Sequence, residues 1–162
     1  MDDLYTKKCE KFSDVTEENF ERIKDLRAES LSDKVYDDET IDLDSFHLTI
    51  YLNGDLIAYS RLCRSSNDDV SLQRFSVSRK HRNKGVSKIL MEFIFKISNE
   101  KFKNSSLILT SRIITKDFYQ KFGFIVYKTL LEQGKERFYM KKKIQIILIS
   151  FACGPFILET TL

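Results

Sequence analysis

The spacing of apolar positions along the chain predicts a mixed α+β domain. Across residues 86–97, apolar side chains recur at intervals of three and four, which places them on one face of an amphipathic helix. Charged side chains at intervals of four follow the opposite face, namely Lys88, Glu92, Lys96 and Glu100. We therefore predict a helix over residues 86–100.

Runs rich in β-branched and aromatic residues predict strands around this helix. Asn53-Gly54 lies between two such runs, and Asn-Gly in that setting is a strong signal for a β-hairpin. Thr16 precedes two glutamates and is a typical residue for capping the start of a helix. In chain order the predicted elements are a strand at 4–12, a helix from Thr16 with Phe20, Ile23, Leu26 and Leu31 on its core face, strands at 46–52, 55–62 and 70–78, the helix at 86–100, a strand at 105–111, a helix at 115–122, and strands at 124–127 and 137–140.

The order of these elements predicts how the sheet is arranged. Strand–helix–strand from residue 70 to residue 111 implies a parallel pair joined by a right-handed crossover. The hairpins on either side imply antiparallel neighbours. We expect a mixed, mostly antiparallel sheet with helices on both faces.

Two segments lack such a pattern. Residues 33–44 are acidic and read as a loop with room for a helical turn, either covering a site or, the favoured interpretation, forming solvated surface. The apolar residues 144–162 form a C-terminal extension of unknown role beyond a domain at residues 1–143. Because Gly154-Pro155 interrupts it and about 20 apolar residues are needed to span a membrane, a strand at an edge or in a homodimer interface is favoured over a membrane anchor.

Composition and charge narrow the classes of function. A net charge of +3 suits an anionic ligand but falls short of the concentrated basic excess of nucleic-acid-binding proteins. Cys9, Cys63 and Cys153 are odd in number and widely spaced, which indicates a reducing compartment and no structural metal. The acidic N-terminal residues do not form a secretory signal, so we expect a cytoplasmic protein.

Candidate chemistry is concentrated in the basic run at residues 79–88, between a predicted strand and a predicted helix. A helix N-terminus presents free backbone N–H groups, and Gly85 would let an anion approach the backbone closely. The run therefore predicts a phosphate-binding turn. The alternatives are a solvated basic turn and a nucleic-acid-binding patch.

Two motifs resemble those of the GNAT N-acetyltransferases. Arg82-x-x-Gly85-x-Ser87 is similar to the family's R/Q-x-x-G-x-G/A phosphate loop, with Ser87 in place of the last small residue and Asn83 in place of a frequent glycine. Tyr119-x-x-x-Gly123-Phe124 resembles its Y-x-x-x-G-F signature. The last hairpin, through Gln133-Gly134, is similar to that of small bacterial ElaA-type members.

The resemblance implies a fold in which the strands at 70–78 and 105–111 splay apart around the pantetheine arm of acetyl-CoA, with a backbone N–H near Val77 as oxyanion donor. It also implies that Tyr119 protonates the leaving thiolate, although a core aromatic is the alternative interpretation. No metal is implied. The implied cofactor-binding residues are Phe75, Ser76, Val77, Arg82, Asn83, Lys84, Gly85, Val86 and Ser87.

The resemblance leaves the general base and the acceptor open. Residues 72–76 of the strand at 70–78 include no carboxylate that could act as a base. Arg74 in this strand has either a structural or a substrate-binding role. Acceptors include small-molecule amines, peptides, protein lysines and aminoacyl-tRNA. The alternative functions are a non-catalytic acyl-CoA-binding or regulatory domain and, less favoured, a nucleic-acid-binding module. The candidate bases, acting through water, are Glu29, Asp42, Asp44 and His47.

Overall fold

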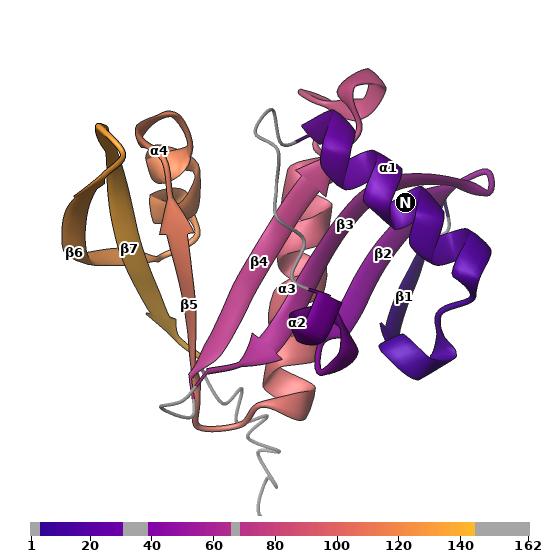
Figure 1. Cartoon of the computed structure of the whole chain (residues 1–162), viewed down its shortest axis with the longest axis horizontal. Coiled ribbons are helices and arrows are strands. Elements are labelled where there is room, and N and C mark those ends of the chain that lie inside the picture. The colour runs from indigo at the N-terminus through magenta and orange to yellow at the C-terminus, as the bar shows by residue number, and fades with distance from the viewer. Residues whose placement is uncertain (1–3, 31–38, 66–68, 145–162) are drawn as a thin grey trace, which may run out of the picture.

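A seven-stranded sheet with helices on both faces forms the framework of the protein (Figure 1). The structure is a computed structural model and describes residues 4–30, 39–65 and 69–144. Its elements are β1 (Tyr5–Lys11), a 3-10 turn (Phe12–Asp14), α1 (Glu17–Ser30), α2 (Glu39–Leu43), β2 (Phe46–Leu52), β3 (Asp55–Arg64), β4 (Val70–Val77), a second 3-10 turn (Arg79–His81), α3 (Val86–Lys101), β5 (Ser106–Ser111), α4 (Ile113–Lys121), β6 (Ile125–Glu132) and β7 (Lys135–Lys143).

The element order predicted from the sequence is confirmed, with differences at several boundaries. The segment expected to be an acidic loop contains the short helix α2 in its described part. Helix α4 begins two residues earlier than expected, because the carbonyl of Arg112 accepts the N–H groups of Thr115 and Lys116 at 3.1 and 3.0 Å. Strand β6 continues to Glu132. Its last residues lack an alternating pattern of apolar and polar side chains, but pairing with β7 keeps them in the sheet.

The sheet order is β1-β2-β3-β4-β5-β7-β6, and every neighbouring pair except β4–β5 is antiparallel. Strands β4 and β5 pair only through Val70↔Leu107 and Ser71↔Ile108, at their first residues. Each strand then follows its outer neighbour, β3 for β4 and β7 for β5, so the two diverge toward their C-terminal ends (Figure 1). The predicted mixed sheet with a splayed parallel pair is confirmed.

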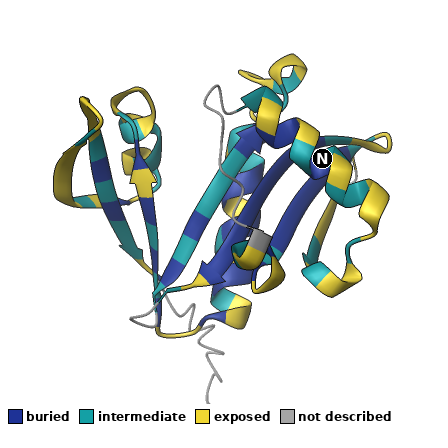
Figure 2. Cartoon of the chain, viewed as in Figure 1, coloured by how far each residue is buried: buried dark blue, intermediate teal, exposed yellow. Residues whose placement is uncertain are grey.

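The main core lies between the sheet and α3. Leu90 and Ile94 of α3 are fully buried against the central strands, as the apolar spacing of this helix predicts, and Met91, which lies outside that spacing, is fully buried as well. On the other face, Ile23 and Leu26 of α1 pack around Tyr59. Figure 2 shows burial concentrated in β2, β3 and α3, whereas the edge strand β6 is largely exposed.

The predicted C-terminal extension lies almost wholly outside the described residues, as does Leu31 of the predicted helix face. The first residue of the C-terminal extension, Ile144, is buried, and the Ile144 N–H donates to the carbonyl of Ser105 at 3.1 Å. In the part of the chain that is described, no helix is long and apolar enough to cross a membrane.

Candidate functional site

A cavity of about 740 Å³ occupies the opening between β4 and β5. Residues 72–75 of β4 line one side and residues 108–110 of β5 line the other. Side chains from α4, β6 and β7 complete the wall beyond β5. The divergence of the two parallel strands therefore produces a site that a ligand can enter between them.

Strand β4 carries a β-bulge in the wall of this cavity. Tyr59 of β3 pairs with Ser76, while Arg61 pairs with Gln73, so three steps along β4 face two along β3. Arg74 has a φ of 55°, a left-handed conformation that is uncommon for a residue other than glycine. The bulge therefore interrupts the regular pairing of β4 with β3 in the wall of the cavity.

Tyr119 enters the cavity from α4. Its ring makes edge contacts with Phe75 of β4 at a centroid distance of 6.1 Å and with Phe124 at 5.9 Å. Burial raises the pKa of the Tyr119 hydroxyl to about 12. Among the residues that the structure describes, none hydrogen-bonds this hydroxyl, so the phenol is protonated at neutral pH and its hydrogen-bonding capacity is available to a ligand.

The basic loop between β4 and α3 is held in a fixed shape. The His81 N–H donates to the carbonyl of Ser78 at 2.9 Å, and the side chains of the same two residues lie 2.7 Å apart. Asn83 and Gly85 have φ values of 59° and 82°. Asparagine tolerates this left-handed region better than most residues, so the departure from glycine at position 83 leaves the loop intact.

The N-terminus of α3 is open to a ligand. Gly85 is its first flanking residue, no side chain among the described residues caps it, and its first turn holds no acidic residue. A Cβ built on Gly85 would meet no atom within 4 Å. Lys88 is the first residue of the helix whose N–H donates to a backbone carbonyl, that of Gly85. Among the described residues, the N–H groups of Val86 and Ser87 have no such acceptor, so they can bind an anion.

The predicted cofactor-binding residues form two groups in the structure. Phe75 lines the cavity beside Tyr119. Ser76 and Val77 are buried further along β4, toward the loop, and the Val77 carbonyl accepts hydrogen bonds from Ser30 and from the Arg82 side chain. These three residues of β4 form the first group. The second group forms the loop and the helix start beyond β4 and does not line the cavity; its members are Arg82, Asn83, Lys84, Gly85, Val86 and Ser87.

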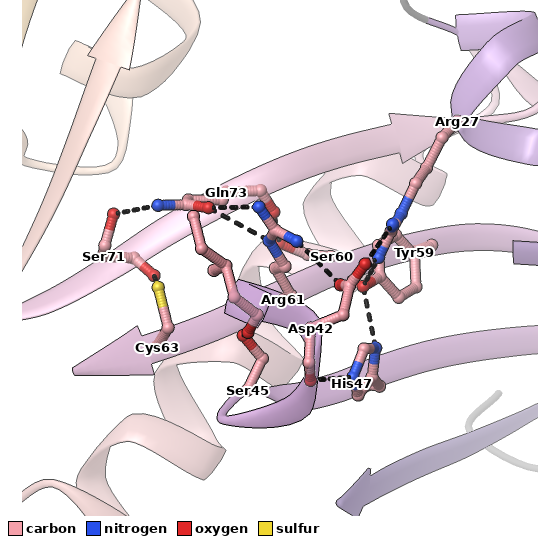
Figure 3. Close-up of polar contacts among 11 residues, drawn as sticks. Arg27, Asp42, Ser45, His47, Tyr59, Ser60, Arg61, Cys63, Ser71 and Gln73 are labelled. Carbon is pink, nitrogen blue, oxygen red and sulfur yellow. Dashed lines mark hydrogen bonds and ion pairs between the residues drawn. The ribbon is translucent and has the colours of Figure 1, made fainter. Parts of the chain in front are cut away.

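Two of the four candidate bases are enclosed in a buried polar network (Figure 3). Asp42 is 1% exposed and accepts hydrogen bonds from Arg27 at 2.7 and 2.9 Å and from Arg61 at 2.7 Å. His47 is fully buried between the Tyr59 hydroxyl, 2.9 Å away, and the Asp42 carbonyl, 3.0 Å away. Neither residue lines the cavity, and both are enclosed by their hydrogen-bond partners, so neither is positioned to act as a base there.

The partners of His47 define its protonation state. Arg27 donates to the Tyr59 oxygen, so the Tyr59 hydroxyl donates to Nδ1 of His47, and Nε2–H donates to the Asp42 carbonyl. Burial lowers the pKa of His47, which agrees with this neutral tautomer. Burial alone would raise the pKa of Asp42, but the hydrogen bonds from Arg27 and Arg61 outweigh it and lower the pKa.

The network also reaches the cavity through Gln73. Arg61 donates from Nε and Nη2 to the Gln73 side-chain oxygen at 3.0 and 2.8 Å, and the Gln73 amide donates to Ser71 at 3.0 Å. Because Gln73 lines the cavity next to the bulge, the network fixes that part of the wall. The sequence signal for this network is Arg61 itself, a charged residue in the interior of a strand that is rich in apolar residues.

The other two candidate bases are placed differently. Glu29 accepts the backbone N–H of Arg79 and thereby ties the end of α1 to the basic loop. Asp44 is exposed and lines a smaller cavity of about 360 Å³ on the α2 side of β4. Neither lines the cavity that holds Tyr119.

One wall of the cavity was not predicted from the sequence. Glu132 of β6 and Arg137 and Tyr139 of β7 face the opening beside Tyr119. No local pattern distinguishes these residues from other polar positions of a hairpin. Among the described residues, no group of three His, Cys, Asp or Glu side chains is placed to hold a metal ion.

Comparisons with known proteins agree with this geometry. A family model described as an acetyltransferase (GNAT) domain matches residues 44–126. Protein ElaA of Escherichia coli is 28% identical over 92 residues, an alignment that covers 56% of this chain and only 60% of that protein.

Solved structures share the fold over a larger part of the chain. The crystal structure of E. coli ElaA has a TM-score of 0.77 at 23% identity, covering 85% of this chain and 99% of that one. An acyl-CoA N-acyltransferase from Pseudomonas aeruginosa has a TM-score of 0.78 at 22% identity with the same coverage. A GNAT family acetyltransferase from Elizabethkingia anophelis, solved with acetyl-CoA bound, has a TM-score of 0.67 at 14% identity, covering 87% of this chain and 99% of that one. With a family model matching half of its length and this fold around the cavity, the chain belongs to the GNAT acetyltransferase family.

Proposed function

We propose that the protein transfers the acetyl group of acetyl-CoA to a primary amine. The observation that carries this proposal is the separation of β4 from β5 around a cavity that contains the Tyr119 hydroxyl. A thioester entering between the strands would meet the bulged backbone of β4 on one side and a protonated phenol on the other. The Elizabethkingia protein, which shares the fold, binds acetyl-CoA, and this supports the choice of cosubstrate.

Two features of the structure support a binding mode for the cosubstrate. Its pyrophosphate would rest on the N–H groups at the start of α3, around Gly85, where no side chain of the described part of the chain occupies the space. Its pantetheine arm would follow β4 past Val77 and Ser76 to Phe75. A strand and the adjoining helix N-terminus thus supply a continuous path for one extended ligand.

The chemistry uses residues on both sides of the cavity. The acceptor ammonium releases a proton to water, its nitrogen forms a bond to the thioester carbon, and the C–S bond breaks. A backbone N–H of β4 near Val77 stabilises the carbonyl oxygen as charge develops. The departing sulfur takes the proton of Tyr119, and the second nitrogen proton restores the phenol through water. The products are an acetamide, free CoA and one proton.

Acetyl-CoA is expected to stabilise the folded protein. At 100 times its dissociation constant, a ligand that binds only the native state adds about 2.7 kcal/mol to the free energy of unfolding. For a domain of this size that corresponds to a rise in melting temperature of roughly 5–10 °C. ATP and NAD at the same concentration serve as controls, and a melting temperature that acetyl-CoA does not change would contradict the proposal.

Replacing Gly85 by valine is expected to weaken acetyl-CoA binding by at least about tenfold, because the new side chain projects into the proposed pyrophosphate site. Its φ of 82° also strains any side chain, at a cost of about 1–3 kcal/mol. Gly54→Val is the matched control, since Gly54 has a φ of 87° and equally open space but lies in the β2–β3 turn. Calorimetric titration of both variants tests this, and equal affinities would place the pyrophosphate elsewhere.

A non-catalytic acyl-CoA-binding domain is the second candidate function. The observation that favours it is the sequence of β4, VSLQRFSV, which contains no carboxylate to act as a base. Release of CoA from acetyl-CoA in the presence of primary amines separates the two functions. Binding without release would favour the second candidate.

We also propose that residues 1–143 form the catalytic domain and that the protein is cytoplasmic. Within the described ranges of the chain, Cys9 and Cys63 are free thiols, which supports a reducing compartment. The possible homodimer remains a prediction.

A further inference from the structure

The wall formed by β6 and β7 carries paired charges of opposite sign. Glu132 and Arg137 both face the cavity, together with Tyr139. Arg137 lies across from Leu130 in the strand pairing, two positions from Glu132, so the two charged side chains share one face of the hairpin. This face lies in the same cavity as the Tyr119 hydroxyl.

The carboxylate of Glu132 has one oxygen engaged and one available. The Tyr139 hydroxyl donates a hydrogen bond to Oε1, which fixes the orientation of the carboxylate. This bond to Glu132 raises the pKa of Tyr139, so Tyr139 keeps its proton and continues to donate. Oε2 lies 3.9 Å from Nε of Arg137, beyond hydrogen-bonding distance, and the Glu132 side chain is 43% exposed.

The guanidinium of Arg137 is likewise only partly engaged. Its 3.9 Å contact with Glu132 is an ion pair without a hydrogen bond, and within the described ranges the Arg137 side chain makes no other ion pair and no hydrogen bond. A guanidinium presents five N–H donors in a plane that matches a carboxylate. Arg137 can therefore bind an anionic group of a ligand while Glu132 binds a cationic one.

The rest of the described cavity wall contains no second carboxylate. Arg74 of β4 and Arg112 beside α4 also line the cavity, whereas Glu132 is the one carboxylate among its described lining residues. Glu132 is therefore the described group of the wall that can form an ion pair with a cationic amine.

We propose that the acceptor is a primary amine that also carries a carboxylate, as an amino acid does, with its amine bound by Glu132 and its carboxylate by Arg137. This inference rests on the proposed acetyltransferase function and names the substrate class of the same site. Glu132 and Arg137 determine specificity, whereas the transfer step itself remains that described for Tyr119. A charge-assisted pair on each group holds the acceptor nitrogen within the cavity that contains the phenol.

The test compares acceptors that differ only in the carboxylate. CoA release is measured with alanine, phenylalanine, glutamate, lysine, β-alanine and 4-aminobutyrate, and with the carboxamide formed from the carboxylate of each. Alongside, the shift in melting temperature with acetyl-CoA is recorded. We expect kcat/KM for at least one carboxylate-bearing amine to exceed that of its amide by about tenfold or more, because the amide loses a charge-assisted pair.

Variants then assign the effect to residues. Arg137→Gln is expected to bring the carboxylate-to-amide ratio close to one, and Arg137→Lys to retain part of it. Glu132→Gln is expected to raise KM for acid and amide alike while leaving acetyl-CoA affinity unchanged. Glu136→Gln and Lys143→Gln are matched controls, because both residues are exposed on β7 and do not line the cavity.

The outcomes separate this inference from the proposed function. The inference is overturned if no carboxylate-bearing amine is acetylated faster than its carboxamide. It is also overturned if acetyl-CoA raises the melting temperature but no amine of the panel is acetylated. A ratio that survives in a folded Arg137→Gln protein overturns the assignment to Arg137. A protein that neither binds acetyl-CoA nor releases CoA instead contradicts the proposed function.

Discussion

Replacing Asp42 with asparagine is expected to lower the free energy of unfolding by about 3–5 kcal/mol, which is on the order of 10 °C in melting temperature. The carboxylate is enclosed between Arg27 and Arg61, and all three side chains are 1% exposed. Removing its charge leaves two buried guanidinium groups without their shared counter-ion. Urea denaturation at neutral pH measures the change.

Asp44→Asn provides the matched control. It removes the same charge two residues along the chain, but Asp44 is exposed, so its loss is expected to change stability by less than about 0.5 kcal/mol. Equal stabilities of the two variants would show that the Arg27–Asp42–Arg61 cluster contributes little to the fold.

The effect of Asp42 also depends on pH in a defined direction. Because its pKa is lowered in the folded state, Asp42 contributes stability that is fully present above the unfolded value of about 3.9 and is lost as the pH falls toward the folded value. The stability difference between wild type and Asp42→Asn should therefore be constant near neutral pH and shrink below about pH 4. A difference that grows on acidification would contradict the assignment.

Replacing Tyr119 with phenylalanine is expected to lower kcat by about 10²-fold or more while acetyl-CoA affinity stays nearly unchanged. The ring contacts with Phe75 and Phe124 persist, and only the hydroxyl is lost. Because no described residue hydrogen-bonds this hydroxyl, the free energy of unfolding should change by no more than about 1 kcal/mol. Turnover with an accepted amine and the melting temperatures of both proteins measure the two effects.

Tyr51→Phe is the control for the loss of a hydroxyl, since Tyr51 is a buried aromatic on β2 outside the cavity. A wild-type rate in Tyr119→Phe would reduce Tyr119 to a packing residue. The pH profile gives a second check. A phenol with a pKa of about 12 remains protonated through the neutral range, so deprotonation of Tyr119 should not lower kcat until the pH rises to about 11.

Much of the fold could be predicted from local pattern. The apolar spacing over residues 86–97 predicted α3, and Asn53-Gly54 predicted the β2–β3 hairpin, because both signals depend on neighbouring residues alone. Prediction was poorer at β6, where residues after 127 are exposed and do not alternate. Their strand conformation comes from hydrogen bonds to β7, which lies between β5 and β6 in the sheet.

The candidate site was predicted in part. The motif at residues 82–87 and Tyr119 could be found because short motifs keep their spacing in the sequence. Glu132 and Arg137 could not, because their relation to Tyr119 depends on how the last hairpin packs beside α4. His47 and Asp42 were candidate bases acting through water, and their enclosure could not be predicted, since a sequence does not show which polar side chains are surrounded by partners from other elements.

By itself, the sequence determined the order of helices and strands, the hairpin turns and the open start of α3, because these depend on side-chain period and backbone conformation within a few residues. Only the tertiary structure decided where β4 leaves β5, which charges are buried and which residues meet in the cavity. The pairing of β4 with β5 stops after Ser71 because each strand follows a different outer neighbour. The cluster around Asp42 unites α1, α2 and β3, segments whose contact depends on how they pack together rather than on any local pattern.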